Sequence, residues 1–235
     1  MSGGTIAERW AEVRAHVAAA CERAGRAPSD VTIVAVSKTH PAGAIREAAA
    51  AGATDFGENY AQELATKQAE LAGAPGMPLR WHYIGRLQRN KAKLVAGKVA
   101  LVHAVDSEEL AGELAKRAAQ LQPILLSVNL GGESTKGGVT AQTAPALAAR
   151  IATLANVRLD GLMTMPPPSD DPEASRPVFD ALRELRDRIA GELGRPLPVL
   201  SMGMSGDYEV AIQCGATHVR IGTAIFGSRP VMIEG

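Results

Sequence analysis

Short apolar runs alternate with longer stretches in which apolar residues recur at helical spacing, and this alternation continues along nearly the whole chain. Short apolar runs bounded by polar residues or glycine predict strands. They occur at residues 31–37, 54–57, 81–84, 101–105, 124–129, 159–163, 199–201 and 218–221. The first of them, VTIVAVS, ends directly on Lys38.

Helical stretches precede and separate these strands. The first contains Ile6, Trp10 and Val13 on one face, and Gly25 is placed to end it. Further helices are predicted at about 42–51, 60–72, 90–96, 108–121, 141–154, 174–193 and 208–214. Ser107 and Ser205 stand where N-caps are expected, and Pro41 suits a first helical position.

This order of elements predicts an α/β fold. Eight strands alternating with helices, without a composition break or a long linker, favour one (β/α)8 TIM barrel with an extra N-terminal helix, formed by residues 1–235 as a single domain. An open doubly wound sheet is the alternative, and the strand count does not exclude it. The proline-rich segment MTMPPPSDDP is too short for a domain linker and is predicted to be a loop over the barrel mouth.

Composition narrows the function classes. The 235 residues are 46% hydrophobic and 21% charged, which is typical of a globular protein with a large core. Lys+Arg and Asp+Glu balance at 25 each, so the total charge gives no footprint for nucleic acid or an anionic membrane. The amino terminus has no apolar signal core, and no apolar run is long enough to span a bilayer, so we expect a cytoplasmic protein.

Metal and redox chemistry receive little support. The two cysteines, Cys21 and Cys214, fit no metal or redox spacing, and the five histidines are scattered. The segment GGESTKGGV around Lys136 is glycine-rich, but it lacks the order of a nucleotide triphosphate loop. We expect it to be a loop after the fifth strand, with Lys136 in solvent.

Lys38 has two interpretations. At the carboxyl end of a strand, a lysine usually extends to solvent. In a barrel, however, the carboxyl ends of the strands carry the chemistry, and an apolar wall disfavours the charged amine, which makes the neutral nucleophile accessible for a Schiff base. The local sequence does not choose between the two.

The end of the chain favours the second interpretation. After the seventh strand comes SMGMSGDYEVAI, and after the eighth comes RIGTAIFG. Glycine turns that lead into helices form anion sites, and barrels often hold phosphate at these two loops. A phosphate held at the loops after the seventh and eighth strands would lie beside the first strand in a closed barrel. Arg220, inside the apolar last strand, would need an acceptor such as a heteroaromatic ring nitrogen if it faces the interior.

Seven motifs together resemble one family. AVSKT, FGENYAQE, WHYIGRLQRNK, STKGG, GLMTM, SMGMSGD and RIGTAIFG are similar, in this order, to the motifs of the pyridoxal phosphate homeostasis proteins, which are single-domain relatives of the amino-terminal barrel of alanine racemase. The resemblance runs from about Val31 to Arg229. It implies a barrel that binds pyridoxal 5'-phosphate (PLP).

The resemblance also implies residue roles. Lys38 would carry PLP as an internal aldimine, and Arg220 would face the pyridine nitrogen. Asn59 and His82 match positions around the cofactor. The phosphate-binding positions fall on Ser205, Gly222 and Thr223, with backbone from Met204 and Gly206. Several relatives have a second lysine two residues after the Schiff-base lysine, where this chain has His40, so a transfer between neighbouring lysines is in doubt here; Lys136 matches a lysine of the family's glycine-rich loop.

Three functions are compatible with these residues. The first is a carrier that holds PLP and hands it over, with PLP-dependent apo-enzymes as recipients, no strong catalysis and a monomeric state. The second is an amino-acid racemase, for which an arginine beside the ring nitrogen is unfavourable and the opposing base of a second domain is missing. The third is a Schiff-base aldolase with Glu58 as its acid–base group. We favour the first.

Overall fold

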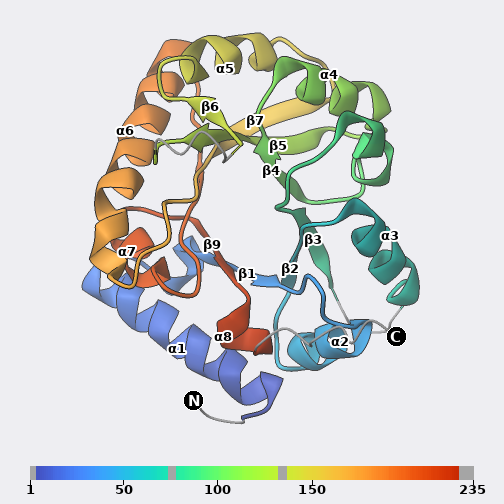
Figure 1. Cartoon of the computed structure of the whole chain (residues 1–235), viewed down its shortest axis with the longest axis vertical. Helices are drawn as coiled ribbons and strands as arrows, with labels where there is room; N and C mark the ends of the chain where they lie inside the picture. The colour runs from blue at the N-terminus through green and yellow to red at the C-terminus, as the bar shows by residue number, and fades with distance from the viewer. Residues whose placement is uncertain (1–3, 74–77, 132–136, 228–235) are drawn as a thin grey trace.

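The computed structural model describes residues 4–73, 78–131 and 137–227. Nine strands and the helices around them alternate along the chain (Figure 1). The strands are β1 (Thr32–Val36), β2 (Asp55–Glu58), β3 (Arg80–Tyr83), β4 (Leu101–Val105), β5 (Gln122–Asn129), β6 (Val139–Thr140), β7 (Val157–Met163), β8 (Val199–Ser201) and β9 (His218–Ile221). All eight predicted strands are confirmed, and β6 is an additional short one.

The helices form a ring outside the strands (Figure 1). The α-helices are α1 (Ile6–Arg23), α2 (Ala42–Ala50), α3 (Ala61–Glu70), α4 (Glu108–Arg117), α5 (Ala144–Ala152), α6 (Arg176–Leu193), α7 (Tyr208–Gln213) and α8 (Thr223–Phe226). Three short 3₁₀ helices are η1 (Pro28–Asp30), η2 (Arg89–Leu94) and η3 (Pro172–Ser175). The first helix begins with a capping box, in which Thr5 and Glu8 satisfy each other's backbone N–H groups.

The sheet closes into a barrel. The strand order is β4-β3-β2-β1-β9-β8-β7-β5, every pair is parallel, and β4 also pairs with β5. The predicted (β/α)8 barrel is therefore confirmed, and the open sheet is excluded because an open sheet leaves two edges. The short strand β6 is not part of this closed ring. It pairs in parallel with the carboxyl-terminal end of β5.

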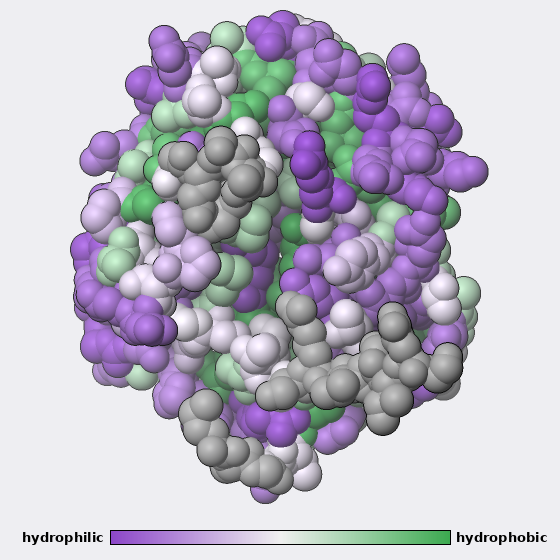
Figure 2. Space-filling model, in the orientation of Figure 1, coloured by the Kyte–Doolittle hydropathy of each residue, from purple (hydrophilic) through white to green (hydrophobic). Residues whose placement is uncertain are grey.

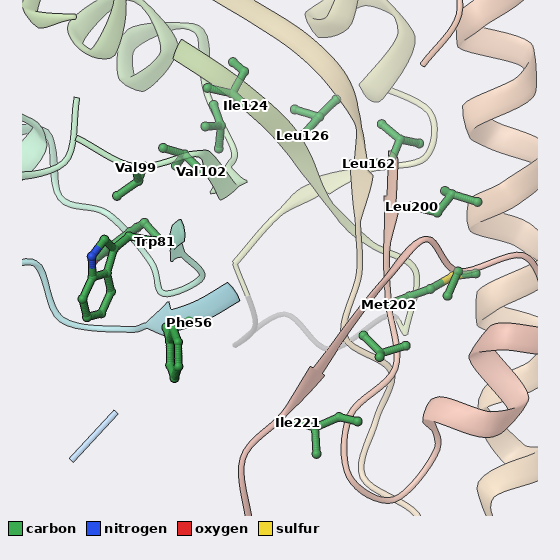
Figure 3. Packing of buried hydrophobic residues seen from close by; sticks show 14 of the residues in the cluster. Phe56, Trp81, Val99, Val102, Ile124, Leu126, Leu162, Leu200, Met202 and Ile221 are labelled. Carbon is green, nitrogen blue, oxygen red and sulfur yellow. The ribbon is translucent and has the colours of Figure 1, made fainter. Parts of the chain in front are cut away.

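The strands alternate between two faces. Leu126, Leu162, Leu200 and Ile221 are fully buried and belong to the hydrophobic layer between strands and helices, where Figure 3 shows them. A separate small cluster of Leu101, Ala104, Leu125 and Met163 lies apart from that layer. Burying one such aliphatic side chain contributes about 1.5–3 kcal/mol, so the outer layer supplies most of the hydrophobic stabilisation.

Some predicted boundaries were wrong. The segment predicted as a helix at 90–96 is the 3₁₀ helix η2, whose start has no side-chain cap. The helix α4 ends at Arg117, because the chain is already extended at Ala118. Helix α2 begins after Pro41, which occupies the N-cap position. Ser107 does cap α4, by accepting a hydrogen bond from the N–H of Leu110.

Candidate cofactor site

A cavity of about 400 Å³ lies at the carboxyl ends of the strands. Figure 2 shows the face of the molecule in the orientation of Figure 1, with a hollow near its centre. The described residues that line the cavity are Val36, Lys38, Asn59, Ile84, Gly85, Arg86, Ala104, Asp106, Ser127, Gly137, Gly138, Met163, Met165, Met204, Ser205, Gly206, Arg220, Gly222 and Thr223. They come from every strand of the barrel or from the loop that follows it. The cavity is thus at the end of the barrel where (β/α)8 enzymes carry their chemistry.

The first and last strands bring Lys38 and Arg220 to the same wall. In the parallel pairing of β1 with β9, Val34 is opposite Arg220 and Ala35 is opposite Ile221. Side chains alternate along a strand, so Val34, Val36 and the position of Lys38 share one face. Arg220 and Gly222 share the matching face of β9. This register is the reason that the half-buried Lys38 and the buried Arg220 both line the cavity.

The peptide groups on both sides of Lys38 are held by a buried ionic network. Lys67 Nζ donates to the carbonyl of Ser37 over 2.8 Å, and the N–H of Thr39 donates to Glu63 Oε1 over 2.6 Å. Lys67 also pairs with Glu63 and with the fully buried Glu58, at 2.6 and 2.7 Å. Thr39 has a left-handed φ of 66°, which is uncommon for a residue other than glycine. The network therefore fixes the turn that carries Lys38.

Glu58 takes part in this network and not in the cavity. Its Oε1 accepts from the hydroxyl of Ser37 over 2.7 Å and from Lys67. Burial raises the pKa of Glu58, although hydrogen bonds from Lys67 and Ser37 act against that increase. Since the residue does not line the cavity, it cannot serve as the acid–base group of a Schiff-base aldolase, and that alternative loses its candidate.

Two glycine turns, one after β8 and one after β9, line part of the cavity. Gly203 has a φ of 90°, and a Cβ there would lie 2.6 Å from the Cβ of Ala211, so only glycine fits the turn after β8. Around Gly206 there is nothing within 4 Å of a Cβ position, which leaves its backbone open to the cavity. The N–H groups of Ser205 and Gly206 have no acceptor among the described residues.

The predicted cap of α7 was wrong. Asp207 is the N-cap residue, and its carboxylate accepts a hydrogen bond from the N–H of Met204 over 2.7 Å. This bond closes a tight turn in which the N–H of Asp207 also returns to the carbonyl of Met204. Ser205 therefore stands at the tip of the turn, with its hydroxyl beside the cavity.

Arg220 faces the interior, as the alternation of β9 requires. Only 4% of the residue is exposed, and burial lowers the pKa of its guanidinium to about 10. Its Nη1 donates to the hydroxyl of Ser201 over 2.6 Å, and its Nη2 donates to the carbonyl of Thr164 over 3.0 Å. Both bonds hold the guanidinium in one orientation at the base of the cavity.

A chain of polar side chains continues from Arg220 through the barrel interior. The hydroxyl of Ser201 lies 2.8 Å from His103 Nδ1, and His103 Nε2 lies 3.0 Å from His82 Nδ1. His82 Nε2 lies 2.8 Å from Asp55 Oδ1, at the amino-terminal end of β2. His82, His103 and Ser201 are fully buried. Hydrogen bonds thus join the base of the cavity to the opposite end of the barrel.

One set of hydrogen-bond directions satisfies every contact of this chain with neutral rings. The hydroxyl of Ser201 accepts from Arg220 and donates to His103 Nδ1. His103 Nε2 then donates to His82 Nδ1, and His82 Nε2 donates to the carboxylate of Asp55, which only accepts. Burial lowers the pKa of His103 far below its ordinary value, in agreement with a neutral ring. Burial alone would raise the pKa of Asp55, but hydrogen bonds from His82 and Thr54 outweigh it and lower the pKa.

The structure brings together eight of the nine residues that the sequence predicted for this site. Lys38, Asn59, Met204, Ser205, Gly206, Arg220, Gly222 and Thr223 all line the cavity. His82 does not, because it lies one layer deeper and its ring bonds to His103 and Asp55. His40 stacks on Phe226, with ring centroids 5.2 Å apart. Lys136 lies outside the described residues.

Several lining residues were missed in the sequence. Ile84 and Met163 stand at the carboxyl ends of their strands on the inward face, so the alternation of each strand was a usable signal. Arg86 and Asp106 lie in the loops that follow β3 and β4. The proline-rich loop does reach the mouth, because Met165 lines the cavity.

The walls of the cavity combine different chemical groups. An amine stands on one side, Arg220 stands at the base, and a hydroxyl with open backbone N–H groups stands at the glycine turns. Val36, Ile84 and Met163 provide apolar contact between them. Asn59 adds a buried amide oxygen that accepts no hydrogen bond from the described residues. Such a cavity fits a flat polar ring that carries an anionic group and reacts with an amine.

Comparison with known proteins shows which family the chain resembles. The family model described as the alanine racemase N-terminal domain matches residues 9–230. A pyridoxal phosphate homeostasis protein of Pseudomonas aeruginosa is 49% identical over 228 residues, which cover 96% of each chain. One of Aquifex aeolicus is 47% identical over 225 residues, which cover 94% of this chain and 97% of the relative.

A solved structure with bound ligand is also similar. PipY of Synechococcus elongatus, determined with PLP bound, is 36% identical with a TM-score of 0.83, and the match covers 95% of this chain and all of PipY (100%). The fold and the site define a (β/α)8 barrel of the alanine racemase N-terminal type. Within that class, the chain belongs to the pyridoxal phosphate homeostasis protein family.

Proposed function

We propose that this protein binds PLP through a Schiff base on Lys38 and acts as a carrier in intracellular vitamin B6 homeostasis, without strong catalytic activity. The observation that carries the proposal is the shared cavity of Lys38, Arg220 and the two glycine turns. In this proposal, residues 1–235 act as one cytoplasmic, monomeric binding unit. No helix in the described part of the chain has the length and apolar composition needed to cross a bilayer.

The residues present fit the cofactor. Ser205, Gly206 and Thr223 would bind its phosphate through a hydroxyl and backbone N–H groups, which suit an anion. Arg220 would donate to the ring nitrogen, and the unsatisfied amide of Asn59 would bond a polar ring substituent. Bound PLP supplies an aldehyde that reacts with amines and a ring that can accept electrons. Lys38 would supply the amine.

Two features support weak catalysis. The guanidinium of Arg220 stays protonated at neutral pH, because burial lowers its pKa only to about 10, so it donates a hydrogen bond to the ring nitrogen without giving up its proton. Racemisation needs a second base opposite Lys38. Among the described lining residues, Asp106 is the only carboxylate, and none is a tyrosine, histidine or cysteine.

Borohydride reduction followed by peptide mass spectrometry tests ligand, chemistry and residue together. Purified protein is mixed with PLP, the absorbance is recorded, and the sample is reduced and digested. We expect a visible absorbance band that reduction removes, and a pyridoxyl adduct on the peptide that contains Lys38. Lys38→Ala serves as the matched variant and should give neither.

The outcome that contradicts the proposal is an adduct on another lysine of the intact protein, or loading of Lys38→Ala at the level of the wild type. Exchange of the α-proton of alanine in deuterium oxide tests the catalytic part. Exchange at enzyme-like rates would favour the racemase alternative over a carrier. Light scattering tests the monomeric state.

A further inference from the structure

A second, larger hollow adjoins the cofactor cavity. Its volume is about 990 Å³, and we call it the basic groove. The residues that line it are Asn59, Tyr60, Ala61, Gln62, Tyr83, Gly85, Arg86, Leu87, Gln88, Arg89, Lys91, Asp106, Ser107, Glu109 and Leu110. Asn59, Gly85, Arg86 and Asp106 line both spaces, so the groove opens beside the mouth of the cofactor cavity.

One wall of the groove has an unusual concentration of positive charge. The segment that follows β3 contributes Arg86, Arg89 and Lys91 to this wall and carries Lys93 and Lys98 beyond it, with no acidic residue among them. The protein as a whole has equal numbers of basic and acidic residues. Total charge therefore conceals a local positive field at this position.

The cations of this segment also lack acidic partners. Elsewhere on the surface, arginine side chains pair with carboxylates, as Arg150 does with Glu108 and Arg176 with Glu173, both at 2.6 Å. Among the described residues, none of Arg86, Arg89, Lys91 and Lys93 makes an ion pair. Their charge is available to a partner without breaking an existing salt bridge.

The backbone beneath these cations is firmly placed. Ala92 and Val95 of the segment are fully buried. The hydroxyl of Tyr83 donates to the carbonyl of Asn59 over 3.0 Å, and a side chain at Gly85 would collide with that same carbonyl. The loops after β2 and β3 are therefore locked to each other. The groove presents its charges on a rigid wall, which lowers the entropic cost of binding.

We propose that the basic groove binds an acidic polypeptide segment of the protein that receives the cofactor. The occupant is a polypeptide because the groove is more than twice as large as the cofactor cavity and has an exposed aromatic rim, Tyr60, which is 56% exposed. Tyrosine and arginine are the residue types that contribute most at protein interfaces. Two carboxylates, Asp106 and Glu109, also line the groove and disfavour a uniform polyanion such as nucleic acid.

The proposal rests on the carrier function and adds the place where the recipient protein would bind to take over the cofactor. Asn59 and Arg86 line both the groove and the cofactor cavity, so a lysine of the bound segment would reach Lys38 past these two residues. Delivery exchanges one amine for another on the aldehyde carbon. The new C–N bond forms, the bond to Lys38 breaks, Lys38 leaves as an amine, and the proton count is unchanged, so no oxidant or reductant is needed.

Peptide binding to the cofactor-free protein provides the test. The probes are three fluorescein-labelled dodecapeptides, each with one central lysine, which contain Asp and Glu, the corresponding Asn and Gln, or further Lys. We expect the acidic peptide to bind at least about tenfold more tightly than its amide counterpart at low salt, with the difference shrinking as salt screens the charges. Fluorescence anisotropy gives the affinities.

Two double variants with the same charge change separate the groove from the surface in general. Arg89→Glu with Lys91→Glu changes the groove wall, and Lys93→Glu with Lys98→Glu changes the same segment outside it. The groove variant should lose the tenfold preference, and the outer variant should keep it within about twofold. Arg89→Gln with Lys91→Gln repeats the test should the charge reversal unfold the protein.

The remaining outcomes are decisive as well. Equal losses in both double variants, equal binding of acidic and amide peptides, or stronger competition by a short single-stranded oligonucleotide would each overturn the acidic-segment proposal. Cofactor loading, recorded in parallel by absorbance, tests the carrier function separately. If the protein binds PLP but does not prefer the acidic peptide, only the groove proposal is rejected. If the protein prefers the acidic peptide but does not bind PLP, the carrier function is rejected and the groove remains a site for acidic peptides.

Discussion

Arg220 donates a hydrogen bond to the hydroxyl of Ser201 over 2.6 Å, and this contact is one end of a chain of hydrogen bonds through the barrel. From Ser201 the chain passes through His103 and His82 to Asp55. A residue that faces the cavity is thus linked to a carboxylate at the opposite end of the barrel.

The first prediction concerns the tautomers of the buried histidines. His103 should be neutral and protonated on Nε2 in the cofactor-free protein, because burial lowers the pKa of its ring and Ser201 donates to its Nδ1. Long-range ¹H–¹⁵N correlation spectra of labelled protein distinguish the two tautomers and the imidazolium form. A proton on Nδ1 of His103 would contradict the assigned direction, because Ser201 would then have to donate elsewhere.

The second prediction concerns Arg220 itself. Arg220→Gln should weaken PLP binding by at least about tenfold, or about 1.4 kcal/mol, and shift the absorbance band of the bound cofactor. The reason is that in the proposed complex the ring nitrogen would lose its donor, and Ser201 and Thr164 lose theirs. Arg176→Gln, which breaks an exposed pair with Glu173, is the control and should bind as the wild type does. Unchanged affinity and spectrum in Arg220→Gln would argue against contact with the ring.

The third prediction concerns the network that holds the turn of Lys38. Lys67→Met should lower the free energy of unfolding by about 3–5 kcal/mol, because it removes the cation that pairs with the fully buried Glu58. The double variant Glu58→Gln with Lys67→Met should recover part of this loss, since it removes both charges. Urea unfolding of the four proteins in the cycle measures the coupling. Additive losses would show that the pair acts independently.

The fourth prediction concerns stability against pH. Burial lowers the pKa of His218 to about 3 from an ordinary value of 6.5, and burial also lowers the pKa of His103. As pH falls below 6.5, the unfolded chain takes up protons that the folded protein does not. The free energy of unfolding should therefore decrease by up to about 1.4 kcal/mol per pH unit for each histidine, and for His218 the loss continues to about pH 3.

Substitution isolates the contribution of one ring. His218→Gln should reduce the slope of stability between pH 6 and pH 5 by about 1 kcal/mol per pH unit. The slope of the wild-type protein is the reference. Urea unfolding at a series of pH values provides both slopes. A slope in His218→Gln equal to that of the wild type would mean that His218 is not held neutral.

Much of the fold was predictable because its signals are local. The eight apolar runs and the helical spacing between them each occupy one short segment, and the strand assignments were confirmed. Lys38 at the end of β1 and the glycines after β8 and β9 were visible for the same reason. The family motifs added Asn59 and Met204, which also line the cavity.

The residues whose places differ from the prediction share a physical cause as well. His82 was expected beside the cofactor, but its depth in the barrel depends on how the strands tilt and stagger when the sheet closes. Ser205 was expected to cap a helix, but Asp207 competes for the same turn. Lys67 gave no signal in the sequence, since a lysine on an amphipathic helix normally faces solvent.

The sequence by itself determined the kinds of elements, their order, and the residues that stand at the strand ends, because alternation and turn chemistry act within a few residues. Only the tertiary structure decided which of those residues meet. Pairing of β4 with β5 closes the sheet, pairing of β1 with β9 brings Lys38 and Arg220 to one cavity, and the polar chain to Asp55 forms inside the closed barrel. These contacts join residues far apart in the chain, and no local pattern encodes them.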